Sequence, residues 1–245
     1  MGKRDRPLSE RLAYYLLKAV NKAVRDYEMI VDGDRIGVAV SGGKDSLTLL
    51  HLLNLRTGVV PERCELVAIH VIMYRPNGSA CAGPQAHEVL ERHFQAQGQA
   101  YAIEHAEVDV EPTCFRCAHV RRRAIFCAAQ RLGCSKVAFG HHADDAAQTT
   151  LLNLFFHGRV ETLSPVRAMW NGALHIIRPL IYLPEKRIAR FAQAAALPVV
   201  DTTCPQSATS RRTLVKDIIC DLEQEYPKVK INLFRAGLRG TDKPP

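Results

Sequence analysis

Apolar positions along this chain form either helical repeats or short continuous runs. Residues 8–29 repeat apolar side chains at helical spacing with Lys and Arg between them, so an amphipathic helix is expected there. The pair Asp32-Gly33 then marks a turn. Arg35 to Val40 follows as a short β-branched run, which is typical of a strand buried on both faces.

Short apolar runs and helical patterns continue to alternate through the rest of the chain. Further strands are expected at 65–72, 101–108, 136–140 and 174–177, and further helices at 47–55, 85–97, 117–132, 146–156 and 184–196. This alternation predicts an α/β fold of the Rossmann-like kind, a doubly wound parallel sheet with helices on both faces. The expected organisation has three parts: an N-terminal helix over 1–30, the sheet domain over 31–200 and a C-terminal helical extension over 201–245.

Composition describes an ordinary globular protein with an excess of positive charge. The chain has 245 residues, 47% of them hydrophobic, which suits a sizeable core and excludes a disordered, coiled-coil or collagen-like protein. No apolar run approaches the roughly 18 residues needed to cross a bilayer, and no signal-peptide core follows Met1. We therefore expect a cytoplasmic protein with no membrane association. The formal net charge of +8 favours a polyanionic partner, although it would also serve solubility alone.

A polar, glycine-rich loop lies between the first buried strand and the helix that begins near Leu47. It reads Ser41-Gly42-Gly43-Lys44-Asp45-Ser46. Glycines allow a tight turn in which backbone N–H groups and a helix N-terminus converge on an anion. It is not a Walker A loop, because Asp45 stands where Ser or Thr would follow the lysine. A plain strand-to-helix turn is the alternative, but doubly wound sheets bind ligands at this carboxyl end of their strands.

A second glycine motif follows the strand expected at 136–140. It reads Gly140-His141-His142-Ala143-Asp144-Asp145 and leads into a helix, in the same topological position as the first loop. Two adjacent carboxylates suit Mg²⁺, which takes oxygen ligands and keeps several waters. One of the two aspartates would alternatively serve as the helix N-cap.

Both motifs resemble those of the ATP pyrophosphatase superfamily, whose sheet is of the PP-loop or HUP-like type. Ser-Gly-Gly-x-Asp-Ser resembles its pyrophosphate loop, and Gly-His-x-x-Asp-Asp resembles the second motif of its tRNA-modifying branch. Members split ATP into AMP and pyrophosphate while activating a carbonyl oxygen. The resemblance implies an ATP site formed by residues 41–46 with Gly140, His141 and Asp144, in which Lys44 neutralises phosphate charge and Asp45 and Asp144 hold Mg²⁺.

One pair of cysteines has metal-ligand spacing. Cys114 and Cys117 are separated by two residues, which lets both sulfurs reach one metal ion or cluster. Cys204, in the loop after the helix that ends near Ala196, is a third candidate. A redox pair or a chance pair would show the same spacing. Three thiols without a clear fourth ligand favour an iron–sulfur cluster with one open iron over a closed zinc site, which needs four protein ligands.

The other cysteines are interpreted as structural. Cys127 and Cys220 are expected to be small buried side chains of helices. Cys64, Cys81 and Cys134 have no metal-spaced neighbour, and Cys81 lies in an irregular loop that could approach the site.

The order of the motifs resembles one family in particular. The chain is similar to the tRNA 2-thiocytidine synthetase (TtcA) family over nearly its whole length, through Cys114-x-x-Cys117 before Arg121-Arg122-Arg123, through Arg178-Pro179-Leu180, and through Cys204 before Arg212 and Lys216-Asp217. The resemblance implies a 4Fe-4S cluster on Cys114, Cys117 and Cys204. It also implies thiolation of cytidine 32 in the anticodon loop of tRNA.

Basic residues accompany both cysteine segments. Arg116 and residues 121–123 lie beside the pair, and Arg211, Arg212 and Lys216 follow Cys204. They would hold tRNA phosphates near the reactive site and make binding salt-dependent, or they are solvated helix faces. Bases of an RNA loop splay out at modest cost, and the candidates for stacking on the target base are Phe115 and Phe156.

These observations lead to the hypothesis of an ATP-dependent tRNA sulfurtransferase. ATP adenylates the O2 of cytidine and releases pyrophosphate, and sulfur then displaces AMP from C2. The catalytic candidates are Cys114, Cys117, Cys204 and Asp45, while His141 would act as a base or orient the adenosine.

The expected partners are the anticodon loop of tRNA and a cysteine desulfurase or other sulfur donor, and the family resemblance also suggests a homodimer. A 2-thiouridine synthetase and a lysidine-type ligase are the alternative enzymes, although amine ligation has no use for three metal-spaced cysteines. A non-catalytic, metal-containing RNA-binding module is the alternative of a different class.

Overall fold

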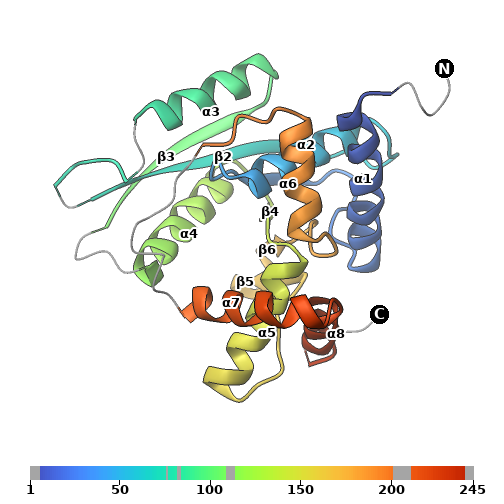
Figure 1. Cartoon of the computed structure of the whole chain (residues 1–245). Helices are drawn as coiled ribbons and strands as arrows, with labels where there is room; N and C mark the ends of the chain where they lie inside the picture. Colours follow the sequence, from blue (N-terminus) through green and yellow to red (C-terminus); the bar gives the residue numbers. More distant parts are fainter. Residues whose placement is uncertain (1–5, 76, 82–83, 109–113, 201–210, 241–245) are drawn as a thin grey trace.

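A six-stranded sheet with the order β3-β2-β1-β4-β6-β5 forms the centre of the molecule (Figure 1). The computed structural model describes residues 6–75, 77–81, 84–108, 114–200 and 211–240. Neighbouring strands run parallel, except that β5 is antiparallel to β6. The strands are β1 (Arg35–Ala39), β2 (Glu65–Tyr74), β3 (Tyr101–Glu107), β4 (Lys136–Ala138), β5 (Val166–Met169) and β6 (Leu174–Ile177).

Helices follow the strands as the apolar pattern predicted. They are α1 (Leu8–Asp26), α2 (Lys44–Thr57), α3 (Pro84–Ala96), α4 (Cys114–Arg131), α5 (Ala143–His157), α6 (Glu185–Ala194), α7 (Arg211–Glu225) and α8 (Val229–Gly240), with a short 3₁₀ turn at Trp170–Gly172. The predicted α/β class is therefore confirmed. Within the described ranges, no helix combines the length and the apolar character that a membrane span requires.

Strand β1 is buried on both faces, as its composition indicated. Its side chains alternate between two hydrophobic clusters. Ile36 and Val38 belong to the larger cluster, which also includes residues of α1, α2, α3, α5 and α6. Ala39 belongs with Ile69 of β2 to the second cluster, which α4 covers. The central strand is thus fixed from both sides, and so is the loop that follows it.

The antiparallel strand β5 was not predicted. It is only four residues long and lies at the edge of the sheet, where Arg167 and Ala168 are exposed. A short edge strand without an apolar run or a clear alternation gives no local signal. The sheet is consequently parallel with one antiparallel edge strand.

Two predictions about buried cysteines were wrong. Cys127 and Cys220 are both exposed. On α4 the buried side follows Ile125, Ala128 and Ala129, and Cys127 lies off this side. On α7 the buried residues Val215 and Ile219 are four positions apart. Cys220 follows Ile219 and is therefore rotated by about 100° around the helix axis, away from the buried side. Cys134, in contrast, is buried.

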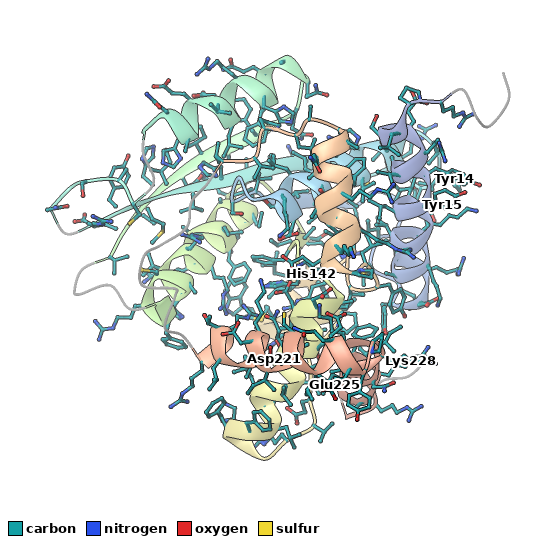
Figure 2. All side chains as sticks on the ribbon, in the orientation of Figure 1. Tyr14, Tyr15, His142, Asp221, Glu225 and Lys228 are labelled. Atoms are coloured by element: carbon teal, nitrogen blue, oxygen red, sulfur yellow. The ribbon has the colours of Figure 1, made fainter. Side chains whose placement is uncertain are left out.

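The C-terminal helices α7 and α8 pack against α5, which leads out of the second glycine motif. Figure 2 shows His142, directly before α5, in the interior, whereas Asp221 and Glu225 lie on the exposed side of α7. Helix α8 packs tightly at Gly237, where a Cβ would lie 2.1 Å from Thr150 Oγ1 and 2.7 Å from Thr162 Cβ.

We expect Gly237→Ala to lower the free energy of unfolding by about 1–3 kcal/mol, because the added methyl group overpacks the contact between α8 and α5. Urea denaturation measures the change. Gly58→Ala is the matched control, since a Cβ there would meet only the Leu55 carbonyl oxygen at an ordinary 3.7 Å. Equal stability of the two variants would contradict the packing described for α8.

Candidate active site

The two glycine motifs meet at the carboxyl edge of the sheet. They follow β1 and β4, which are parallel neighbours at the point where the strand order reverses. A Cβ on Gly140 would lie 3.0 Å from the carbonyl carbon of Asp45 and 3.1 Å from the Ser46 nitrogen. Only glycine lets the second motif approach the backbone of the first so closely. The two motifs therefore form one site.

The first loop is held by its own serines. The Ser41 N–H donates to Ser46 Oγ at 3.1 Å, and Ser46 Oγ donates to the Gly43 carbonyl at 2.9 Å. Gly42 takes a φ of +92°, which favours glycine. Gly43 is the N-cap of α2, and no side chain among the described residues caps it. The N–H groups of the first turn of α2 are thus open to an anion such as phosphate.

The lysine of the loop lies in an ion pair. Lys44 Nζ is 2.9 Å from Glu185 Oε1 at the start of α6 and 3.2 Å from Asp45 Oδ2. Burial alone would lower the pKa of Lys44, but the Glu185 and Asp45 carboxylates outweigh it and raise that pKa. Burial likewise opposes the ionisation of Glu185, and Lys44 overcomes it and lowers the pKa of Glu185. Lys44 is therefore charged, and an incoming phosphate must compete with Glu185 for it.

We expect Glu185→Gln to tighten ATP binding about threefold, because removing the competing carboxylate frees Lys44 for the phosphates and a partly exposed ion pair is worth up to about 1 kcal/mol. Isothermal titration with a non-hydrolysable ATP analogue measures the affinity. Glu10→Gln, on the exposed side of α1, removes a carboxylate that is distant in sequence from Lys44 and Glu185, and it should leave the affinity unchanged. Weaker binding by Glu185→Gln would show that Glu185 supports the nucleotide site directly.

Asp45 carries a buried oxygen that fits a cation. Its Oδ1 atom has no hydrogen-bond partner in the described part of the chain. Burial raises the pKa of Asp45, although His142 and Lys44 oppose this shift. His142 Nε2 lies 3.8 Å from Oδ1. An ionised carboxylate oxygen left in this position is a suitable ligand for Mg²⁺.

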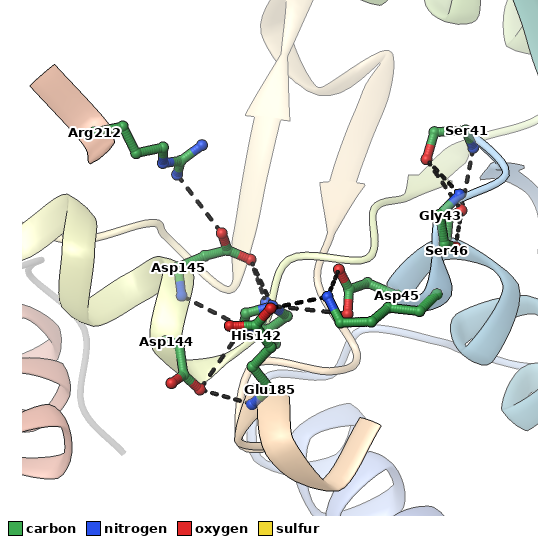
Figure 3. Close-up of polar contacts among 10 residues, drawn as sticks. Ser41, Gly43, Asp45, Ser46, His142, Asp144, Asp145, Glu185 and Arg212 are labelled. Atoms are coloured by element: carbon green, nitrogen blue, oxygen red, sulfur yellow. Dashed lines mark hydrogen bonds and ion pairs between the residues drawn. The ribbon is translucent and has the colours of Figure 1, made fainter. Parts of the chain in front are cut away.

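The two carboxylates of the second motif face different groups (Figure 3). Asp144 Oδ2 accepts the Glu185 N–H at 2.7 Å, and its Oδ1 is 3.0 Å from Lys230 Nζ of α8. Asp145 lies 3.4 Å from His142 Nε2 and 3.7 Å from Arg212 of α7. Both aspartates thus tie the site to the C-terminal helices, and both face the His142 imidazole, since Asp144 Oδ2 lies 3.9 Å from its Nδ1.

His142, rather than an aspartate, is the N-cap of α5. Its Nδ1 accepts the Asp145 N–H at 3.4 Å, and Asp145 Oδ2 accepts the His142 N–H at 3.0 Å in a capping box. Because Nδ1 accepts, Nε2 carries a proton, and it faces the carboxylates of Asp45 and Asp145. The local sequence did not identify this role of the second histidine.

His141 and Arg178 bring two further buried atoms without partners in the described ranges, His141 Nδ1 and Arg178 Nε. Burial, followed by the charge of Arg178, lowers the pKa of His141 to about 4, so this histidine is neutral at physiological pH. Burial also lowers the pKa of Arg178 to about 10, and its guanidinium stays charged. In the sequence Arg178 stood out only through the family resemblance. Buried polar atoms of this kind indicate a place for a polar group of a substrate.

The cysteine pair begins helix α4. Cys114 is the first residue of α4, and Cys117 stands three residues later, within one helical turn. Cys117 is half-buried, the side chain of Cys114 is not described, and Cys204 lies outside the described ranges. Among the described side chains, no three His, Cys, Asp or Glu residues are grouped for a metal ion. The cluster on three cysteines therefore stays a prediction.

Cations from both cysteine segments approach the second motif. Arg122 of α4 and Arg212 of α7 both contribute to lowering the pKa of His141, behind its burial and Arg178. Residues 121–123, Arg211 and Arg212 are exposed. The Arg211 guanidinium lies 4.7 Å from the Phe156 ring centre. Phe115, between the two cysteines of α4, is 79% exposed and stacks on His119. Both predicted aromatic candidates are thus accessible beside basic residues.

Comparisons with known proteins agree with this site. A family model described as the PP-loop domain matches residues 9–222. This match, the sheet and the two joined loops define a PP-loop protein.

Two relatives narrow the class further. The tRNA-cytidine(32) 2-sulfurtransferases of Anaeromyxobacter sp. (strain Fw109-5) and Geobacter sulfurreducens are each 38% identical to this chain. The alignments cover 95% and 93% of this chain, and 78% and 90% of the two relatives. The chain belongs to the tRNA-cytidine(32) 2-sulfurtransferase family, as the order of its motifs implied.

A solved structure shows the same fold. The U34-tRNA thiolase NcsA from Methanococcus maripaludis, determined with its 4Fe-4S cluster, superposes with a TM-score of 0.75. The superposition covers 94% of this chain and 79% of NcsA, at 24% sequence identity. Because the sequence identity is only 24%, this similarity supports the shared fold alone.

Proposed function

We propose that this protein uses ATP to replace the C2 oxygen of cytidine 32 in tRNA by sulfur. The observation that carries the proposal is the junction of the two glycine motifs, where Gly140 lies against the backbone of Asp45 and Ser46. It brings an open helix N-terminus, a lysine and a buried carboxylate oxygen together in a chain that is 38% identical to tRNA-cytidine(32) 2-sulfurtransferases. Exposed arginines beside this site suit an RNA substrate.

ATP would lie with its phosphates on the loop of residues 41–46 and the first turn of α2. Asp45 is the first ligand for Mg²⁺, which would neutralise phosphate charge there. The sequence suggested Asp144 as the second ligand, but its two oxygens already bond the Glu185 N–H and Lys230. Asp145 is engaged to the same extent, through the His142 N–H and Arg212, and both aspartates lie near the His142 ring, at 3.9 Å for Asp144 and 3.4 Å for Asp145. Asp144 therefore stays the predicted second ligand.

The first step activates the base. The C2 carbonyl oxygen of the cytidine attacks the α-phosphorus of ATP, a new O–P bond forms, and the P–O bond to pyrophosphate breaks. Lys44 and the N–H groups of α2 stabilise the charge on the departing phosphates. The attacking carbonyl oxygen carries no proton, so this step needs no general base. His141, whose pKa is about 4, is a weak base and is better suited to orient a substrate group.

The second step exchanges oxygen for sulfur. A 4Fe-4S cluster on Cys114, Cys117 and Cys204 supplies, when bound, an open iron that can hold the incoming sulfur. Hydrosulfide, released from the persulfide of a cysteine desulfurase or other donor by two electrons from a thiol reductant, forms the C2–S bond. The C2–O bond breaks, AMP leaves with the oxygen, and one proton is released. The arginines of α4 and α7 would hold the anticodon loop over the site meanwhile.

The nucleoside content of tRNA tests this proposal. We expect tRNA from a strain without this gene to lack 2-thiocytidine in mass spectrometry and to regain it when the intact gene is returned. Thiouridines should stay at their normal level, which separates this activity from that of a 2-thiouridine synthetase. Unchanged 2-thiocytidine would overturn the proposal, and loss of thiouridine alone would favour the alternative enzyme.

A further inference from the structure

The exposed side of α1 carries cations and tyrosines in one continuous stripe. We call it the α1 stripe, and its members are exposed and three or four residues apart or adjacent: Arg11, Tyr14, Tyr15, Lys18, Lys22 and Arg25. Figure 2 shows Tyr14 and Tyr15 on the outer side of the helix. The opposite side of α1 supplies Ala13, Leu16 and Val20 to the core. Packing therefore accounts for the buried side of α1 but not for the cations Arg11 and Lys18 of the α1 stripe.

The α1 stripe has an excess of positive charge. Arg11 and Lys18 form no ion pair with the described residues, while Lys22 and Arg25 share Asp26. The Lys18 ammonium lies 4.5 Å from the Tyr14 ring centre, and the two tyrosine rings contact each other edge-on at 5.6 Å. Tyr14 and Tyr15 are 50% and 62% exposed. The exposed Tyr15 offers a hydroxyl donor between the cations.

One end of the α1 stripe contacts the segment that leads into α6. Tyr182 donates its hydroxyl to Asp26 at 3.1 Å, and the Lys22 ammonium lies 4.9 Å from the Tyr182 ring centre. Tyr182 is three residues before Glu185, which pairs with Lys44 of the phosphate loop. Arg25 and Arg11, the two ends of the α1 stripe, are 14 residues apart, which corresponds to about 21 Å along the helix axis.

We propose that the α1 stripe binds the phosphate backbone of tRNA outside the anticodon loop. The inference rests on the proposed function, since it takes tRNA as the substrate whose loop occupies the active site. A duplex carries about one charge per 1.7 Å, so a length of about 21 Å presents about twelve phosphates. Cations and hydroxyl donors bind phosphate groups, and such contacts hold a nucleic acid without reading its sequence. The α1 stripe thus contributes affinity for the body of the tRNA.

A charge-neutralised variant tests the inference against a matched control. The variant is Arg11→Gln with Lys18→Gln, both exposed on a helix, where glutamine is nearly as good a helix former as arginine or lysine. The control is Arg35→Gln with Arg63→Gln, which removes the same charge at the amino edge of the sheet. Binding of each protein to full-length tRNA and to an isolated anticodon stem-loop is measured over a range of salt concentrations.

The expected result is a loss of affinity that is confined to the α1 variant and to full-length tRNA. The α1 variant should bind full-length tRNA about tenfold more weakly, and the salt slope should fall by about 1–2, as for the loss of two phosphate contacts. Its affinity for the stem-loop should stay within twofold of the unaltered protein, as should the affinity of the control for both RNAs. Equal losses on both RNAs, equal losses in both variants, or a changed oligomeric state would overturn the inference. Failure of the unaltered protein to thiolate cytidine 32 would instead overturn the proposed function.

Discussion

Asp45→Asn should abolish tRNA-dependent release of pyrophosphate from ATP, with a loss of about a thousandfold, because it removes the buried carboxylate charge that fits Mg²⁺. Radiolabelled pyrophosphate release measures the reaction. Asp221→Asn, on the exposed side of α7, removes the same charge and should retain full activity. Activity of Asp45→Asn above about a tenth of the original would contradict the metal-binding role.

The same substitution should stabilise the empty protein. Burial raises the pKa of Asp45, so the folded state favours the protonated carboxyl, and ionisation at neutral pH costs folding free energy. This cost is absent in acid and appears as the pH rises through the raised pKa. Asparagine removes it, and thermal unfolding without nucleotide should show a higher midpoint for Asp45→Asn at pH 7 and no gain near pH 3. A lower midpoint at pH 7 would show that the carboxylate supports the fold.

Cys117→Ala should abolish 2-thiocytidine formation, by about a thousandfold, and leave pyrophosphate release intact. Cys117 is one of three predicted cluster ligands, and three thiolates are the fewest that hold a 4Fe-4S cluster with an open iron. Adenylation of the base depends on the other end of the site, at Lys44 and Asp45. Mass spectrometry of the tRNA and analysis of iron and sulfide after anaerobic purification measure the two effects.

Cys127→Ala is the matched control for this substitution. Cys127 lies on the same helix, is an exposed thiol, and is outside the predicted ligand set. It should keep both the iron content and the thiolation activity. Iron-free protein that contains zinc, or full thiolation by Cys117→Ala, would contradict the cluster assignment.

Local patterns predicted most of the fold and the two halves of the nucleotide site. The β-branched run before Ser41 and the glycines at 42, 43 and 140 are signals contained in a few consecutive residues. Cysteine burial was predicted less well, because a rotation of one position on a helix exchanges the buried and exposed sides. Cys127 and Cys220 are exposed for this reason.

Long-range partners were not predictable in the same way. Glu185 reads as an ordinary acidic residue in the first turn of a helix, yet it pairs with Lys44 across 141 positions of sequence. Lys230 lies in a segment whose pattern shows only a helix, and its contact with Asp144 depends on how α8 docks on α5. Such contacts arise from tertiary packing, which the hydrophobic periodicity of a single segment does not predict.

The chain of contacts from Lys230 through Asp144 and Glu185 to Lys44 has a consequence for the order of assembly during synthesis. Helix α8 is made after every strand of the sheet, since it begins at Val229. Domains fold largely in the order in which they leave the ribosome. Asp144 therefore acquires its lysine partner only when the last helix has been released, and a chain truncated before Val229 would carry both glycine motifs without that support.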